Sequence, residues 1–309
     1  MQENNQTTII EFFLLGFQVN QNWRIFLFSL LLLIYCGTIC GNLLIITLVS
    51  TSKNLHTTMY FFISQLSVSD ILLPTDIVPN MLSIQLNNGG KITFSGCMAQ
   101  FYFFCATEEF ESLLLTLMSY DRYVAICNPL HYISIMTGTL CVKLIVIFWL
   151  LSFFTSFIYF EIILGLKFCG SNIIDHLFCD LVPLQTISCS DTFPMKIQLY
   201  LLSIPFLIIP SMIIVISYAK IVRVILQIRS NISRHKAFST CSSHLTVVSI
   251  FYFTIFSVYI VPTSEQTSDV NKILSLLYTV FTPLINPIIY SFRNKDIKKA
   301  VQEIIRKYH

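Results

Sequence analysis

Residues 25–49 read IFLFSLLLLIYCGTICGNLLIITLV and contain no charged side chain. In an α-helix this stretch would be about 37 Å long, enough to cross a hydrocarbon core of about 30 Å. A bilayer offers the backbone no hydrogen-bonding partner, so spanning segments are helices or strands of closed barrels. The residues do not alternate between apolar and polar, as barrel strands would. The stretch therefore predicts a transmembrane helix.

The whole chain has the composition of a membrane protein. Of its 309 residues 55% are hydrophobic and only 11% are charged, against about 25% charged in soluble domains, and the mean hydropathy is +0.73. Further apolar runs cover about 58–84, 97–122, 141–165, 197–222, 241–262 and 271–292. We expect an all-α membrane protein, a seven-helix bundle over 25–292, with a tail at 1–24 and another at 293–309.

The basic residues predict the orientation. With the N-terminus outside, 14 of the 19 Lys and Arg residues fall on the cytoplasmic side, as the positive-inside rule requires. The net charge of +3 reflects these basic residues on the cytoplasmic side and gives no sign of a nucleic-acid partner. The outer side then carries a glycosylation sequon at Asn5. It also carries four cysteines, which favour disulfides there but allow three pairings by spacing alone, at 97, 169, 179 and 189.

The C-terminal segment predicts an amphipathic helix. Ile297, Ala300, Val301, Ile304 and Ile305 recur at helical spacing with lysines between them. Such a helix would lie on the inner surface of the membrane. A solvated tail helix is the alternative interpretation.

Sequence motifs near the ends of the spans point to one family. The third span ends in LMSYDRYVAICNPLHY (117–132), which contains Asp121, Arg122 and Tyr123. Other motifs are GN (41–42), LHTTMYFFISQLSVSD (55–70), SYAKI (217–221), KAFSTCSSH (236–244) and PLINPIIYSFRN (283–294). Together they resemble vertebrate odorant receptors of the tetrapod-type class II branch, within the rhodopsin-like (class A) G-protein-coupled receptors. The chain departs from that pattern at Thr58, usually proline, Ser119, usually alanine, and Phe253, commonly glycine.

The resemblance implies a function. The chain would bind a small volatile odorant inside the bundle and activate a stimulatory, olfactory-type G protein, which raises cyclic AMP. It would lie in the plasma membrane, in the cilia of olfactory sensory neurons, and would need no cofactor. The alternatives are a seven-helix receptor for a non-odorant small molecule, or a transporter or channel. A transporter predicts inverted repeats or a filter motif, and an enzyme predicts a nucleophile or metal motif; we find neither.

The resemblance also implies residue roles. Cys97 would pair with Cys179, and Cys169 with Cys189. The switch that opens to the G protein would be formed by Asp121, Arg122, Tyr123, Tyr218 and Tyr290. A polar core linking spans 1, 2 and 7 would be formed by Asn42, Asp70 and Asn286.

Three glutamates lie inside the apolar third span, at 108, 109 and 111. Ionisable residues in a membrane usually face the interior of the bundle. Glu111 matches a glutamate typical of odorant receptors, which approaches the acidic residue of span 2, here Asp70. Two buried carboxylates would share a proton or hold a cation, and oxygen ligands favour sodium. A purely structural hydrogen-bonded pair is the alternative.

Glu108 and Glu109 lie about one turn outward, at the depth where such receptors bind odorants. Either one contacts the ligand, as counter-ion to an amine or acceptor for a hydroxyl, or both are structural. Phe104 takes the position where aminergic receptors carry an aspartate, so an amine site here would differ from theirs. The rest of the predicted pocket, which simple helix packing would also explain, is Phe104, Cys105, Leu202, Phe206, Tyr252, Ile255, Phe256, Tyr259 and Thr279.

Overall fold

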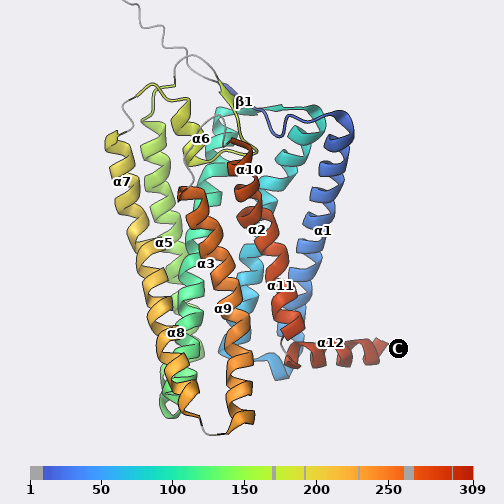
Figure 1. Cartoon of the computed structure of the whole chain (residues 1–309), viewed down its shortest axis with the longest axis vertical. Coiled ribbons are helices and arrows are strands. Elements are labelled where there is room, and N and C mark those ends of the chain that lie inside the picture. The colour runs from blue at the N-terminus through green and yellow to red at the C-terminus, as the bar shows by residue number, and fades with distance from the viewer. Residues whose placement is uncertain are drawn as a thin grey trace, which may run out of the picture.

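The computed structural model describes residues 10–168, 172–190, 193–228, 230–260, 268–293 and 295–308. Within these ranges seven long helical segments stand side by side as a bundle (Figure 1). They are α1 (Gln21–Thr51), α2 (Thr58–Asn87), α3 (Phe94–Cys127), α5 (Gly138–Leu164), α7 (Phe193–Ser203) with η3 (Ile204–Ile208) and α8 (Ile209–Gln227), α9 (Asn231–Ile260), and α10 (Ser268–Leu276) with η5 (Leu277–Phe281) and α11 (Thr282–Arg293). The predicted seven-helix bundle is confirmed.

Helix α3 is less apolar than the other six spanning segments. The other segments are long and apolar enough to cross a bilayer on composition alone. The three glutamates of α3 reduce its apolar character, but α3 packs against α2, α5 and α8 and so lies among protein. Glu109 and Glu111 are buried there. A membrane helix surrounded by other helices can carry such groups because protein, rather than lipid, surrounds them.

Two segments contain a wide turn of π-helix. The turn η3 includes Pro205, which has no N–H to continue an α-helical ladder. The second turn is η5, between α10 and α11. Wide turns of this kind are frequent at functional sites, and both lie beside the cavity described below.

The outer end is covered by a small sheet. Strand β1 (Glu11–Leu14) pairs antiparallel with β2 (Gly90–Thr93) and parallel with β3 (Ile173–Ile174). The loop that carries β3 continues into the short helix α6 (Leu181–Thr186), and Figure 1 places this helix at the outer end of the bundle. The Cys97–Cys179 disulfide ties the same loop to α3. The N-terminal segment and this loop therefore form one cover.

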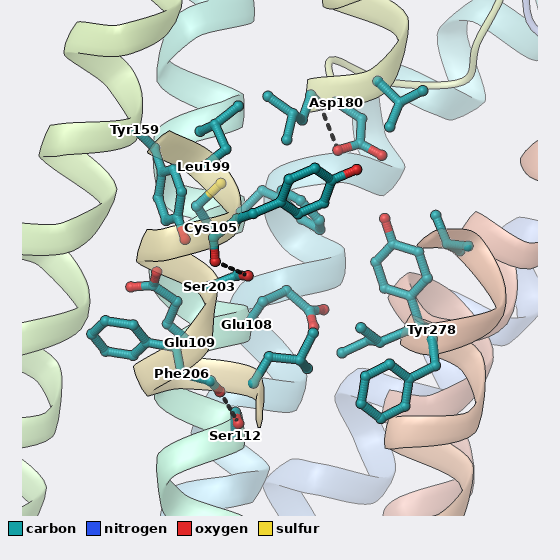
Figure 2. Close-up of a pocket in the computed structure, with 18 of the residues that line it drawn as sticks. Cys105, Glu108, Glu109, Ser112, Tyr159, Asp180, Leu199, Ser203, Phe206 and Tyr278 are labelled. Carbon is teal, nitrogen blue, oxygen red and sulfur yellow. Dashed lines mark hydrogen bonds between the residues drawn. The ribbon is translucent and has the colours of Figure 1, made fainter. Parts of the chain in front are cut away.

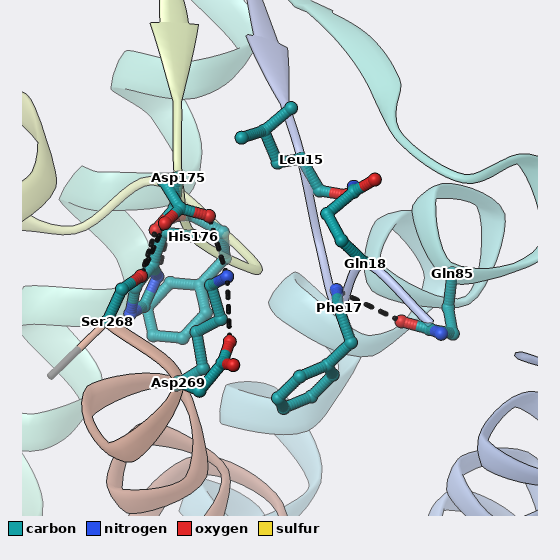
Figure 3. A network of polar contacts seen from close by, with 10 residues as sticks. Leu15, Phe17, Gln18, Gln85, Asp175, His176, Ser268 and Asp269 are labelled. Carbon is teal, nitrogen blue, oxygen red and sulfur yellow. Dashed lines mark hydrogen bonds and ion pairs between the residues drawn. The ribbon is translucent and has the colours of Figure 1, made fainter. Parts of the chain in front are cut away.

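A polar network fastens this cover to α10 (Figure 3). Lys272 is buried and pairs with Asp175 at 2.6 Å and with Asp269 at 3.3 Å. Burial opposes ionisation of Asp175, but hydrogen bonds from Lys272 and Ser268 outweigh it and lower the pKa of Asp175. Burial also lowers the pKa of His176 to about 4, so its imidazole is neutral at pH 7. The Lys272–Asp175 ion pair, and the Ser275 hydroxyl of α10 at 3.3 Å from Nε2 of His176, thus hold the cover in place.

The inner end contains short elements and the C-terminal helix. These are η1 (Lys53–Leu55), η2 (Pro129–His131), α4 (Tyr132–Ile135) and α12 (Lys295–Tyr308). Helix α12 extends sideways from the inner end of the bundle (Figure 1), and its residues Ile297 and Ala300 are buried against the core. The Tyr60 hydroxyl donates to the Asp296 carboxylate at 2.9 Å. The expected amphipathic helix is therefore present and packed.

Candidate functional site

A cavity of about 350 Å³ opens inside the outer half of the bundle. Its walls come from α3, α5, α7, η3, α9 and η5, and residues around α6 form its roof. Figure 2 shows side chains from these elements converging on it. The volume falls within the range of small-molecule sites. The cavity is therefore the candidate ligand site.

Most of the predicted pocket residues line this cavity. Those that do are Phe104, Cys105, Glu108, Glu109, Phe206, Ile255 and Phe256. The structure places Leu202, Tyr252 and Thr279 outside its wall. Leu202 packs into the outer apolar cluster, and the Thr279 hydroxyl donates to the Ser275 carbonyl one turn earlier in its own segment. The side chain of Tyr259 lies outside the described residues.

Tyr252 takes part in the structure beneath the cavity. Its hydroxyl lies 2.9 Å from the Ser112 hydroxyl, which also donates to the Phe206 carbonyl. That carbonyl belongs to the wide turn η3. Ser112 therefore joins α3, η3 and α9 at one point below the ligand site.

The two glutamates of the cavity have no hydrogen-bond partner among the described residues. All four carboxylate oxygens of Glu108 and Glu109 are buried, and none has a partner in the described part of the chain. Glu108 is close enough to Glu111 and Asp180 for electrostatic interaction with both carboxyl groups. Buried polar groups normally are hydrogen-bonded, so these oxygens require an explanation.

Sequence reasoning missed Asp180 and Tyr278, which also line the cavity. Burial raises the pKa of Asp180 to about 6, even though hydrogen bonds from the Leu181 amide and the Tyr278 hydroxyl work in the opposite direction. The one available signal was the position of Asp180 next to Cys179. The predicted disulfide of that cysteine would bring the residue to the outer end of α3.

The polar core gathers as the resemblance implied. The Asn286 amide donates to both oxygens of Asp70, at 3.0 and 3.2 Å, and also contacts the Glu111 carboxylate. The Asn42 amide donates to the Pro283 carbonyl at 3.0 Å, which joins α1 to α11. Four buried oxygens around this cluster have no partner in the described residues: Asn42 Oδ1, Ser69 Oγ, Glu111 Oε1 and Asn286 Oδ1.

The inner end of α3 holds a closed network around Asp121. Its Oδ2 accepts two hydrogen bonds from the Arg122 guanidinium, at 2.5 and 3.0 Å. Its Oδ1 accepts from the Tyr132 hydroxyl at 2.8 Å and from the Thr58 hydroxyl at 3.0 Å. Proline, the usual family residue at position 58, has no hydroxyl. Threonine in place of proline at position 58 was therefore the sequence feature that pointed to the hydrogen bond with Asp121.

The other predicted switch residues lie nearby on α3, α8 and α11. The Tyr218 hydroxyl lies 2.5 Å from Nδ1 of His244. Tyr290 is buried, and its hydroxyl has no partner in the described part of the chain. The Lys220 ammonium stands 5.3 Å above the ring of Tyr123. The inner face thus combines a paired carboxylate with an unpaired tyrosine.

The expected Cys97–Cys179 disulfide is present, with the two Cα atoms 5.5 Å apart. Cys189 is also disulfide-bonded. Its expected partner Cys169 and the glycosylation sequon at Asn5 lie outside the described residues.

Comparison with known proteins identifies the family. The sequence profile described as "Olfactory receptor" matches residues 30–307. Olfactory receptor-like protein I9 of Rattus norvegicus is 42% identical, over 99% of this chain and 98% of the relative. Olfactory receptor 11L1 of Homo sapiens is 45% identical, over 99% and 95%, and olfactory receptor 1J2 of Homo sapiens 41% identical, over 99% and 98%. The chain therefore belongs to the olfactory receptor family of G-protein-coupled odorant receptors, which are multi-pass proteins of the plasma membrane and not enzymes.

Proposed function

We propose that this receptor, when a volatile ligand fills the outer cavity, activates a stimulatory, olfactory-type G protein and raises cyclic AMP. One observation carries the proposal: the cavity wall and the Asp121 network belong to the same helix, α3. A ligand that binds the active arrangement better than the resting one shifts the population toward release of Arg122. The Ser112 junction below the cavity gives α3 a contact with η3 and α9 through which they can move together.

The test is an odorant response in cells whose stimulatory G-protein genes have been deleted. The receptor is expressed there with the olfactory α-subunit, with an inhibitory α-subunit, or with neither, and cyclic AMP is measured across an odorant panel. We expect a rise only with the olfactory subunit. A receptor that reaches the surface and instead lowers cyclic AMP through the inhibitory subunit would overturn the assigned coupling.

We also propose that the polar core holds a sodium ion. Asp70 and Glu111 supply negative charge, and the unpartnered oxygens of Asn42, Ser69 and Asn286 are further ligands of the kind that hard cations prefer. A bound cation would also offset the repulsion between the two buried carboxylates.

The sodium proposal is tested by the thermal stability of purified receptor. A ligand that binds only the folded state stabilises it according to its concentration and affinity. We expect the unfolding temperature to rise by a few degrees when sodium replaces potassium, in wild type and in the control Glu161→Gln, but not in Asp70→Asn. Equal unfolding temperatures in both salts for wild type would favour the structural hydrogen-bonded pair.

A further inference from the structure

The cavity contains more carboxyl groups than its own residues pair. Glu108, Glu109 and Asp180 all line it, and none of them forms an ion pair within the described residues. The basic residue among its lining groups, Lys196, is exposed. A buried polar group without a hydrogen-bond partner destabilises the folded protein, and a charged one does so more strongly. Within the described residues, the cavity therefore lacks a cation or hydrogen-bond donor for the buried carboxyl groups of Glu108 and Glu109.

The two glutamates occupy different parts of the cavity (Figure 2). The Glu108 side chain extends across the cavity toward Tyr278, below the Asp180 roof. Glu109 lies on the opposite side, beside Ser203 and Phe206. Glu108 is therefore the carboxylate that a ligand in the centre of the cavity would meet.

Aromatic rings surround the same space. Phe104 and Tyr278 have ring centroids 6.0 Å apart, and Phe104 packs on Phe178 at 5.5 Å. Aromatic faces attract organic cations, and the attraction is stronger when the cation is desolvated. An ammonium group supplies positive charge and several N–H donors at once. An alcohol of the same skeleton supplies one donor and no charge.

We propose that the cavity selects small organic monoamines, with Glu108 as the counter-ion and Glu109 and Asp180 as further acceptors. The hydrocarbon part of the ligand would lie against the aromatic and aliphatic wall. The volume of about 350 Å³ limits the ligand to a small skeleton. This inference rests on the proposed function only in using cyclic AMP as one of its two readouts.

The experiment pairs primary amines of four to eight carbons with alcohols of matched skeleton. Wild type, Glu108→Gln and Glu109→Gln are compared with Glu161→Gln, the same substitution at an exposed residue of α5. The first readout is cyclic AMP in cells with the olfactory G protein. The second is ligand-induced thermal stabilisation of purified full-length receptor, which needs no G protein.

We expect amines to activate and stabilise wild type and the Glu161 control. Glu108→Gln should lose at least tenfold in amine potency and lose the stabilisation, and Glu109→Gln should lose less. Surface expression should stay equal, because Gln has the shape of Glu. Stabilisation by amines without cyclic AMP would contradict the proposed coupling and support the ligand class. Activation by alcohols alone, or full amine potency in Glu108→Gln, would overturn the ligand class and leave the receptor function standing.

Discussion

Helix α3 carries carboxylates at two depths, and they differ in how they are satisfied. Near the inner end, Asp121 accepts four hydrogen bonds from Arg122, Tyr132 and Thr58. In the outer cavity, the oxygens of Glu108 and Glu109 accept none within the described residues. The Asp121 carboxylate is satisfied by the protein itself, whereas the carboxyl groups of Glu108 and Glu109 lack partners in the described part of the chain until a ligand supplies them. One rigid helix thus joins a closed site to an open one.

This difference explains how a small ligand could operate the receptor. A hydrogen bond to a charged group contributes about 1.5–3 kcal/mol to stability, so under the proposed switch the four bonds at Asp121 would favour the resting arrangement. A ligand can shift that equilibrium only by its difference in affinity for the two states. Unpartnered carboxyl groups in a buried cavity offer a large difference, because even a small movement changes whether they are paired.

The substitution with the largest expected effect removes the positive charge from the closed site. Arg122→Ala should reduce the odorant-evoked rise in cyclic AMP by more than tenfold, because no guanidinium would remain to engage the G protein. Surface labelling should stay near the wild-type level, since the Arg122 side chain is only partly buried. A normal cyclic-AMP response from this variant would show that the Asp121 network is structural and that the switch lies elsewhere.

A smaller effect is expected when the closed site is loosened while Arg122 is kept. Thr58→Val and Tyr132→Phe each delete one hydroxyl that donates to Asp121. We expect basal cyclic AMP to rise by about two- to fivefold in each, because the resting state loses part of about 1.5–3 kcal/mol.

The matched control for the loosened switch is Ser119→Ala, which removes a nearby hydroxyl that bonds back to Thr116 within the same helix. Its basal signal should stay at the wild-type level. If the basal signal of Thr58→Val and of Tyr132→Phe equals that of wild type and of Ser119→Ala, Thr58 and Tyr132 do not hold the resting state.

The sequence predicted the elements that depend on local chemistry. Apolar length identified the spans, and the helices extend beyond them because bundle helices continue past the hydrocarbon core; α9, for example, begins at Asn231 rather than near residue 241. The expected cluster of Asp70, Glu111 and Asn286 also matches the structure. Its position depended on motifs, since hydropathy alone does not reveal which polar residues meet.

Contacts between distant segments could not be predicted in the same way. Whether Tyr252 or Tyr278 faces the cavity depends on the rotation of α9 and on the wide turn η5, which shifts the register of side chains below it. Asp180 reaches the roof because the outer loop folds inward across the disulfide. Thr58 meets Asp121 through the packing of α2 on α3. Each of these depends on tertiary geometry that helical periodicity does not encode.

The smallest expected effect concerns the roof of the open site. Because the pKa of Asp180 is raised to about 6, its carboxylate is mostly charged at pH 7.4 and about three-quarters neutral at pH 5.5, where an alkylamine stays protonated. Amine potency should therefore fall by about two- to threefold between these pH values in wild type, and stay flat in Asp180→Asn. The folded receptor binds this proton more tightly than the unfolded chain, so its stability should change in the opposite direction and rise slightly as pH falls through 6. Potency measured by cyclic AMP and unfolding temperature measured on purified receptor would test both signs. The same pH dependence in Asp180→Asn as in wild type would place the titrating group elsewhere and leave the roof without a role in ligand recognition.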